Sequence, residues 1–327
     1  MNHAGRMGAG FDSRVSRANS MALPMNSAFA FLDLLGFSDY VKADLPGAAR
    51  LLESQHQILH TKLGDAKWYQ AKNENITAFA EERLVTSFKH FLPFSDCIFI
   101  ASETPDLFVR QLAHFLIEVF LFTGHAYGHP EDPENPTRID SRVIGGVKTQ
   151  PYHWYPVLWR GGLGFGQVEL LESAGIKQDQ PFSVPLLVGS AVVNAVRLEK
   201  TAKGPRLFCP ATFKSNLTDP KLQSYFVTVP ERSDLEEFLW PMFLFNDHAK
   251  PVQELGQLHE LLLPAVNLWR ATKIPEAKVQ YLEFIRLLDR SARVWAEQHG
   301  VIEEGRDFLH RQVQAFKLDD LPAGILA

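Results

Sequence analysis

The segment from residue 28 to residue 35 constrains the fold more than any other part of the sequence. It is a continuous apolar run, Ala-Phe-Ala-Phe-Leu-Asp-Leu-Leu, and Gly36 ends it. Such a run bounded by glycine is typical of a strand that is buried on both faces of a sheet. Asp33 lies inside the run, and an ionised carboxylate in a dry strand costs several kcal/mol unless a charge or a metal ion compensates it. The sequence therefore predicts a central strand with an aspartate that needs a cationic partner.

The other apolar patterns complete an α+β fold. In chain order they predict a helix, a hairpin, a helix, a strand, a helix and a strand, at residues 38–63, 85–101, 106–122, 157–171, 192–202 and 206–209. This β-α-ββ-α-β-α-β order suits a ferredoxin-like or palm-type mixed sheet that is covered by helices.

The domain organisation follows from shifts in composition. Residues 1–25 hold three arginines among Gly, Ser and Asn without an apolar segment, which predicts a disordered N-terminal lead rather than a signal peptide. Residues 26–230 form the predicted main domain, interrupted at 124–155 by an insertion rich in Gly, Pro, Asn and Asp. From residue 231 to residue 327 helical patterns dominate, with Pro275 at a predicted helix start, so this part is expected to be a helical extension.

Composition excludes several classes of function. The net charge of −5 gives no basic field for nucleic-acid binding. The most apolar stretch, 112–122, contains His114 and Glu118 and is too short to span a bilayer. Cys97 and Cys209 are the only cysteines, and they predict buried thiols in a reducing compartment. We expect a soluble cytoplasmic protein that contacts neither nucleic acid nor membrane.

A second carboxylate interrupts another apolar run. Asp96 lies within residues 94–100, and either it or Asp33 taken alone is as well explained by an outward-facing edge position or by pairing with an arginine. Two such carboxylates on neighbouring strands would repel each other unless divalent cations bridge them to phosphate oxygens. The turn after Asp33, residues 34–38, leads into a predicted helix whose free amides suit a triphosphate.

Five segments, in this order, resemble the motifs of class III nucleotidyl cyclases, the adenylate and guanylate cyclase superfamily. Phe31–Ser38 and Phe94–Cys97 are similar to the two metal motifs. Arg160–Gly166 is similar to a strand that precedes the helix with the transition-state residues, Gly189–Glu199 is similar to that helix, and Pro205–Leu207 is similar to the strand that follows it. The second motif has Ser95 where the family usually has glycine.

The resemblance implies a role for each matched residue. Asp33 and Asp96 would bind two divalent metal ions, Mn²⁺ or Mg²⁺, with the Leu34 carbonyl as a further ligand. The triphosphate would be held by Arg160 and by the amides of the turn, at Leu35, Gly36, Phe37 and Ser38. Arg197 would stabilise charge on the transferring phosphoryl group from the opposite subunit of a head-to-tail homodimer. The ribose 3′-hydroxyl would attack the α-phosphorus and expel pyrophosphate.

The sequence departs from the family pattern at three places. The family's catalytic asparagine falls on Val193, and the positions that read a purine base fall on Leu92 and Leu186. Leucines cannot read the hydrogen-bonding edge of a purine in the usual way. The departures resemble a bacterial subgroup, the Pycsar antiphage cyclases. That resemblance implies UTP or CTP as the substrate, and cyclic UMP or cyclic CMP as a second messenger in antiphage defence.

Other interpretations remain open at this point. The chain fits a catalytically inactive cyclase-like module that binds a nucleotide or a partner, or a purine cyclase with an unusual pocket. A palm-type diguanylate cyclase or polymerase would need an acidic signature turn that the sequence lacks. His125 and His129 have the spacing of zinc ligands but lie in a Gly/Pro-rich segment without an acidic or Cys helper in register, so zinc is not favoured.

Overall fold

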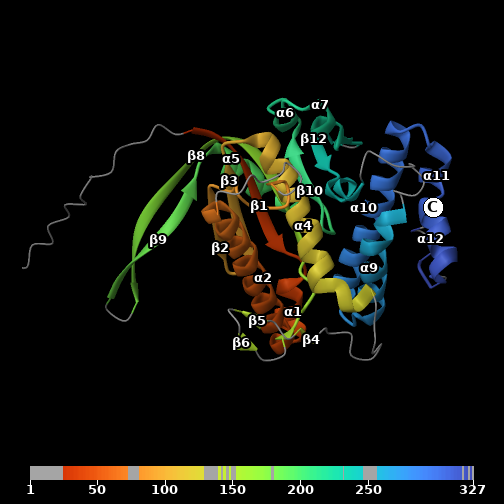
Figure 1. Cartoon of the computed structure of the whole chain (residues 1–327), viewed down its shortest axis with the longest axis horizontal. Coiled ribbons are helices and arrows are strands. Elements are labelled where there is room, and N and C mark those ends of the chain that lie inside the picture. The colour runs from red at the N-terminus through yellow and green to blue at the C-terminus, as the bar shows by residue number, and fades with distance from the viewer. Residues whose placement is uncertain are drawn as a thin grey trace, which may run out of the picture.

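The computed structural model of the chain is built around one mixed eight-stranded sheet, which confirms the predicted α+β class (Figure 1). The structure describes residues 25–72, 81–128, 139–140, 143–144, 147–148, 152–177, 180–230, 232–245, 256–318, 320–322 and 325. The predicted N-terminal lead, apart from residue 25, and most of the predicted insertion lie outside these residues. Helices cover both faces of the sheet.

The sheet has the strand order β11-β12-β10-β8-β1-β3-β2, with β9 paired to β8. Its strands are β1 (Met25–Leu34), β2 (His90–Phe94), β3 (Cys97–Ser102), β8 (Trp159–Lys177), β9 (Gln180–Val188), β10 (Leu207–Pro210), β11 (Phe226–Val229) and β12 (Arg232–Phe238). Strand β10 runs parallel to β8, and the other pairs are antiparallel. Two small ladders stand apart, formed by β4 (Ile139–Asp140) with β7 (Tyr152–His153) and by β5 (Val143–Ile144) with β6 (Val147–Lys148).

The described α-helices are α1 (Phe37–Ala43), α2 (Leu45–Lys72), α4 (Pro105–Gly128), α5 (Ser190–Leu198), α6 (Ala211–Lys214), α7 (Pro220–Ser224), α9 (His259–Ala271), α10 (Pro275–Gln298), α11 (Ile302–Arg306) and α12 (Phe308–Phe316). Short 3₁₀ turns are η1 (Glu199–Thr201), η2 (Trp240–Leu244) and η3 (Gly256–Leu258). Helices α9 to α12 lie at the end of the molecule opposite the hairpin β8–β9, which projects from the body as an arm (Figure 1).

Strand β1 is the central strand that the sequence predicts, because it pairs with β3 on one side and β8 on the other. Ala28, Ala30 and Leu32 face the larger apolar core, and Phe29 and Phe31 face a smaller one. All five are buried, as expected for a strand with a covered sheet on both faces. The two-residue alternation places Asp33 on the same face as the two phenylalanines.

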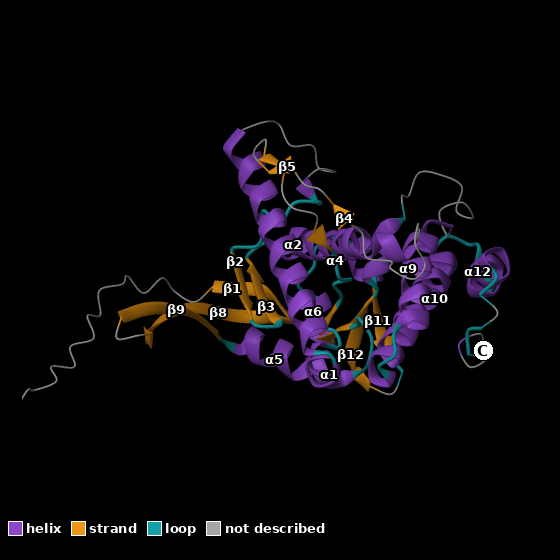
Figure 2. Cartoon of the chain, turned by 90° about the horizontal axis from the view of Figure 1, so that it is seen from below, coloured by secondary structure: helices purple, strands orange, loops and turns teal. Residues whose placement is uncertain are grey.

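The two faces carry different helices. Figure 2 shows α2 and α4 on one side of the strands and α5 on the other. Within the described residues, one segment, Pro105–Gly124 of α4, is long and apolar enough to cross a membrane, but 72% of its most apolar window is buried inside the fold. Helix α4 therefore has the character of a core helix.

Helix α5 packs unusually close to the sheet because the strand beneath it lacks side chains. A Cβ atom at Gly162 would lie 2.2 Å from the Ala195 carbonyl oxygen, and one at Gly164 would lie 2.3 Å from that of Ala191. No larger residue fits at either position without moving the helix. The glycines that break up the predicted strand therefore bring α5 onto β8 and β1.

Several boundaries differ from the sequence-based expectation. Strand β12 lies beyond residue 230 yet pairs with both β10 and β11, so the sheet does not end where the main domain was expected to end. Strand β2 begins at His90 rather than at residue 85, and it includes Pro93, which an edge strand tolerates. Helix α4 continues to Gly128, inside the range expected to be irregular.

We expect Gly164→Ala to destabilise the protein, because its new Cβ atom would collide with the backbone of α5. Overpacking of this kind typically costs about 1–3 kcal/mol of unfolding free energy. Gly64→Ala in α2 is the matched control, since nothing lies within 4 Å of its added Cβ and alanine favours a helix. Thermal melts of both variants check this, and an unchanged melting temperature for Gly164→Ala would contradict the packing of α5.

Candidate active site

The strand register brings three functional side chains to one place. Asp33 on β1 lies opposite Cys97 on β3 and opposite Arg160 on β8. Residues that are directly opposite in an antiparallel pair have their side chains on the same face. The Arg160 side chain reaches the Asp33 carboxylate, with Nη2 3.1 Å and Nε 3.2 Å from Oδ2. The negative charge of Asp33 is therefore paired with an arginine. Of the two cationic partners that the sequence allows for it, an arginine or a metal ion, this is the simpler.

Asp96 reaches the same face from the tight turn between β2 and β3. The Leu34 amide donates a 2.8 Å hydrogen bond to the Asp96 carbonyl, which ties this turn to the end of β1. Ser95, just before it, has a φ of 55°, in the left-handed region that glycine adopts most easily. This backbone requirement gives a physical reason for the glycine that the resemblance leads one to expect at this position.

Asp33, Asp96 and Cys97 form a group suited to metal binding. One ligand atom from each, a carboxylate oxygen or the thiol sulfur, lies within 4.8 Å of the other two. Burial, with the two carboxylates close by, raises the pKa of the Cys97 thiol well above its usual range, so the thiol remains protonated at neutral pH. The available donors are therefore carboxylate oxygens, the ligand type that Mg²⁺ and Mn²⁺ favour. The residues fit a hard divalent cation.

The electrostatics of Asp33 show a carboxylate under strain. Its pKa is raised from 3.8 to about 6, chiefly by burial. Arg160 opposes this shift, whereas the negative charges of Glu199 and Asp96 add to it. One arginine does not balance three nearby carboxylates, and a divalent cation between Asp33 and Asp96 would relieve the remaining repulsion.

Glu199 is a member of this cluster that the sequence does not single out as functional. It lies in η1, just after α5, is buried, and forms an ion pair with Arg160. The guanidinium of Arg160 thus lies between two carboxylates, Asp33 and Glu199. Its expected role, contact with a triphosphate, would require this side chain to share or exchange its present partners.

A cavity of about 600 Å³ opens over the cluster. The carboxylates of Asp33 and Asp96 lie in its wall, together with Leu34, Gly36 and Ser38 of the turn. Three cations also line it, namely Arg197 at the end of α5, Lys200 in η1 and Lys203 in the loop after η1. A cavity lined by both carboxylates and cations suits a ligand that combines metal ions with phosphates.

The turn after β1 differs in one detail from the expected phosphate cradle. The Leu35 amide donates a 2.8 Å hydrogen bond to the Leu158 carbonyl, so it is not free to bind phosphate. Helix α1 begins at Phe37, with Gly36 before it at a φ of 77°, in the left-handed region. The first amides of a helix have no partner within the helix, which leaves Phe37 and Ser38 as the available donors, with Gly36 completing the turn.

The predicted base-contacting residues lie away from this cavity. Leu92 is half-buried on the edge strand β2, and Leu186 is exposed on β9, in the projecting arm. Val193, which replaces the family's asparagine, is exposed on α5. None of the three is among the residues that line the cavity within one chain.

Comparisons with known proteins return structures of nucleotide cyclases. The chain is similar to a bacterial light-regulated adenylyl cyclase, at 15% identity and a TM-score of 0.38 over 65% of this chain and 50% of that one. It is also similar to the dimeric guanylyl cyclase domain of the RhoGC fusion protein from the aquatic fungus Blastocladiella emersonii, at 15% identity and a TM-score of 0.36, over 66% and 96% of the two chains. The adenylyl cyclase CyaB from P. aeruginosa has 12% identity and a TM-score of 0.32, over 65% and 90%.

The chain thus spans about half the length of the light-regulated cyclase. No protein-family model matches the sequence. No curated protein matches it either. At these identities and TM-scores, a function has to be argued from the cavity and its residues.

We expect Asp33→Asn to stabilise the protein at neutral pH in the absence of divalent metal. Because the pKa of Asp33 is higher in the folded state than the ordinary 3.8, native stability falls as pH rises from about 4 to about 6. An amide does not titrate, so the variant escapes this loss, which is on the order of 1–3 kcal/mol.

Melting temperatures at pH 4.5 and pH 7.5 in EDTA measure the effect. The gap between the variant and the wild type should be wider at pH 7.5, whereas Asp65→Asn, an exposed substitution on α2, should show no such trend. If the difference in melting temperature between Asp33→Asn and the wild type narrows as pH rises, the raised pKa of Asp33 is contradicted.

Proposed function

We propose that this protein is a nucleotidyl cyclase. It converts a nucleoside triphosphate, UTP or CTP, to the 3′,5′-cyclic mononucleotide and pyrophosphate, with two divalent ions, Mn²⁺ or Mg²⁺, held by Asp33 and Asp96. The observation that carries the proposal is the convergence of these two carboxylates, from different strands, at the wall of one cavity that also has a cationic side. A pair of crowded carboxylates next to cations without acid partners is the arrangement that a metal–polyphosphate ligand neutralises.

The residues of this chain divide the work of the proposed reaction. Divalent ions bound at Asp33 and Asp96 would supply Lewis acidity, which lowers the pKa of the ribose 3′-hydroxyl. The Leu34 carbonyl would be a further ligand. The amides at Gly36, Phe37 and Ser38 face the phosphates in this proposal, and Arg197 stabilises the charge that develops on the α-phosphoryl group. The 3′-oxygen forms a bond to the α-phosphorus. The bond between the α-phosphorus and the oxygen that bridges it to the β-phosphorus breaks, so pyrophosphate leaves, and the hydroxyl proton passes to solvent.

The finer parts of the proposal are supported by the motif resemblance. The pyrimidine preference follows from Leu92 and Leu186 at the positions where purine cyclases have polar residues. The head-to-tail homodimer follows from the expected origin of Arg197 in the opposite subunit. The location of both leucines away from the cavity of one chain is compatible with a base pocket that a second subunit completes. The product would act as a second messenger in antiphage defence.

One observation favours a second candidate, a cyclase-like module that binds a nucleotide without turning it over. Arg160 already pairs with Asp33 and Glu199, so the cluster has a cation of its own. The exposed Val193 on α5 also takes the place of a catalytic asparagine. Such a module would still bind metal and nucleotide but would release the triphosphate unchanged.

Turnover separates the two candidates. Purified protein with Mn²⁺ is incubated with ATP, GTP, CTP and UTP, and the products are identified by mass spectrometry. We expect a cyclic pyrimidine mononucleotide, and we expect Asp33→Ala and Asp96→Ala each to abolish its formation, because each removes a metal ligand. Asp65→Asn, on the exposed face of α2, is the control and should retain activity.

Each outcome of this panel has a reading. If all four triphosphates survive while Mn²⁺ and nucleotide together raise the melting temperature, the module that binds without turnover is correct. If only ATP or GTP reacts, the chain is a cyclase but the pyrimidine proposal is wrong.

Subunit complementation tests where Arg197 acts. Asp96→Ala and Arg197→Ala are each expected to be inactive alone. In a head-to-tail dimer, mixing them assembles one site with an intact Asp96 and an intact Arg197 from different chains, so part of the activity should return. Activity that stays absent at all mixing ratios, with dimers present by light scattering, would instead assign Arg197 to the cavity of its own chain, where its side chain already lines the wall.

A further inference from the structure

Three cations of the candidate cavity have no acidic partner among the described residues. Arg197, Lys200 and Lys203 all line the cavity, and none of them forms an ion pair there, whereas Arg160 in the same wall forms two. Their spacing of three residues brings the first two to one side of the α5–η1 helical run. The proposed reaction uses Arg197 individually but assigns no individual role to Lys200 or Lys203.

The loop that follows η1 and carries Lys203 is held by contacts with α10. Gly204 follows Lys203, has a φ of +82° and packs so tightly on α10 that an added Cβ atom would lie 2.5 Å from the Cβ of Glu283. Its amide donates a 2.6 Å hydrogen bond to Oε1 of Gln280, also on α10. The loop therefore takes its position from a helix that lies more than seventy residues later in the chain.

Gln280 joins the loop to the cavity itself. The residue is only 4% exposed, and it lines the candidate cavity together with Lys203. It also lines a second cavity, of about 450 Å³, which shares Gly36 with the first. A buried amide in this position is a rigid contact point between the helical C-terminal region and the cationic wall.

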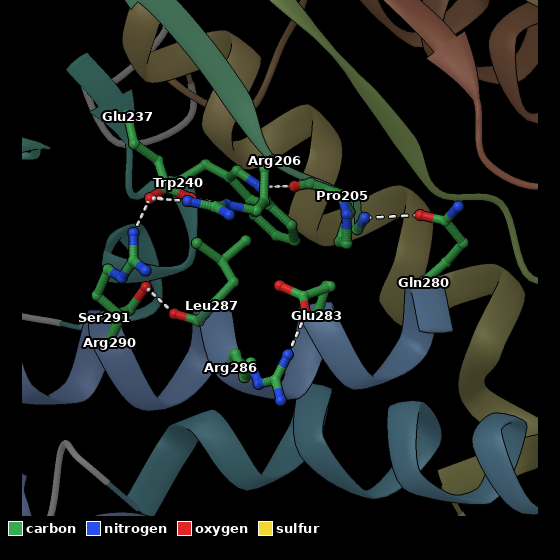
Figure 3. Close-up of polar contacts among 11 residues, drawn as sticks. Pro205, Arg206, Glu237, Trp240, Gln280, Glu283, Arg286, Leu287, Arg290 and Ser291 are labelled. Carbon is green, nitrogen blue, oxygen red and sulfur yellow. Dashed lines mark hydrogen bonds and ion pairs between the residues drawn. The ribbon is translucent and has the colours of Figure 1, made fainter. Parts of the chain in front are cut away.

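The rest of this contact region makes the arrangement rigid. The Glu237 carboxylate on β12 accepts from Nε and Nη2 of Arg206 at 2.5 and 2.8 Å, and it also pairs with Arg290 of α10. The Trp240 indole N–H donates to the Pro205 carbonyl at 2.9 Å. Figure 3 shows these contacts along one side of α10. They fix α10 against the residues that directly follow Gly204. The backbone of Gln280 is therefore held in place relative to the loop that its side chain contacts.

We propose that Lys200 and Lys203 form a subsite for the terminal phosphates of the bound nucleotide, and that Gln280 is the residue that positions this subsite through Gly204. The identity of the ligand rests on the proposed function, but any polyphosphate that enters the cavity meets the same cations. The two lysines bind the phosphates directly. Gln280 acts through the loop, so α10 is part of the binding site although its own side chains supply no charge to it.

A double-mutant cycle on the full chain tests this with magnesium tripolyphosphate as the probe and titration calorimetry as the measurement. The variants are Gln280→Met, which keeps the side-chain length but removes the acceptor, Lys200→Gln combined with Lys203→Gln, and all three changes together. We expect the lysine pair to weaken binding about 10-fold or more, and Gln280→Met to weaken it about 3- to 10-fold. In the background without the lysines, Gln280→Met should change affinity less than about 2-fold, because it has no subsite left to position.

Two controls keep the outcome clear. Ser291→Ala removes a hydrogen bond that stays within α10, to the Leu287 carbonyl, and should leave tripolyphosphate affinity unchanged. Gly204→Ala disturbs the same contact from the loop side and should reproduce the Gln280→Met pattern. The test can therefore use whichever of the two variants folds better. Unchanged affinity in Gln280→Met, or effects of Gln280 and the lysines that simply add, would overturn the inference.

The same variants separate this inference from the proposed function. With an active wild type, Gln280→Met should raise KM for the triphosphate more than it lowers kcat, since the subsite holds phosphates in the ground state as well. A wild type that shows the coupled tripolyphosphate pattern but cyclises no triphosphate contradicts the proposed function and supports the subsite. An active wild type without that coupling supports the proposed function and contradicts the subsite.

Discussion

The Asp33 carboxylate is the point on which the arrangement of the site depends. It is held by the backbone of a central strand with partners on both sides, so it cannot move away from Asp96, Cys97 or Arg160 without breaking two ladders. Burial raises its pKa to about 6, and the nearest cation is shared with Glu199. A fold that keeps a carboxylate in this state gives up stability at neutral pH. Such strain is typical of a functional site, where a ligand restores the charge balance.

Close backbone packing also positions a cation of the cavity, Arg197. Gly162 and Gly164 let α5 approach the sheet so closely that its last turn ends beside the acidic cluster. The apolar face of the helix is buried against β8 and β1, and Arg197 is left at the cavity. The position of Arg197 relative to the carboxylates is thus fixed by the main-chain contacts of α5 rather than by flexible side chains.

The sequence predicted those features that break a local rule. Asp33 and Asp96 stand out because charged residues interrupt apolar runs. Strand alternation puts Asp33 on the face that the structure shows, whereas Asp96, expected within a strand, lies in the turn between β2 and β3. Glu199, Lys200 and Gln280 break no such rule, since each is an ordinary polar residue in a helical pattern. Their significance comes from tertiary contacts between distant segments, which a single sequence does not reveal. Strand β12, which lies between β10 and β11, was missed for a similar reason, because a short strand of mixed polarity, Arg232–Phe238, gives little periodic signal.

The position of β12 and α10 changes how the C-terminal third of the chain should be understood. A unit that ended at residue 230 would lose the strand between β10 and β11, and with it Glu237, which is fully buried between two arginines. Arg206 would then be left without its main partner next to the loop that carries Lys203, and Gly204 would lose the acceptor on Gln280. Breaking one side of a buried ion pair is strongly destabilising, and the loss falls at the wall of the cavity. The helical region is therefore better described as the rear support of the candidate active site than as an appended extension.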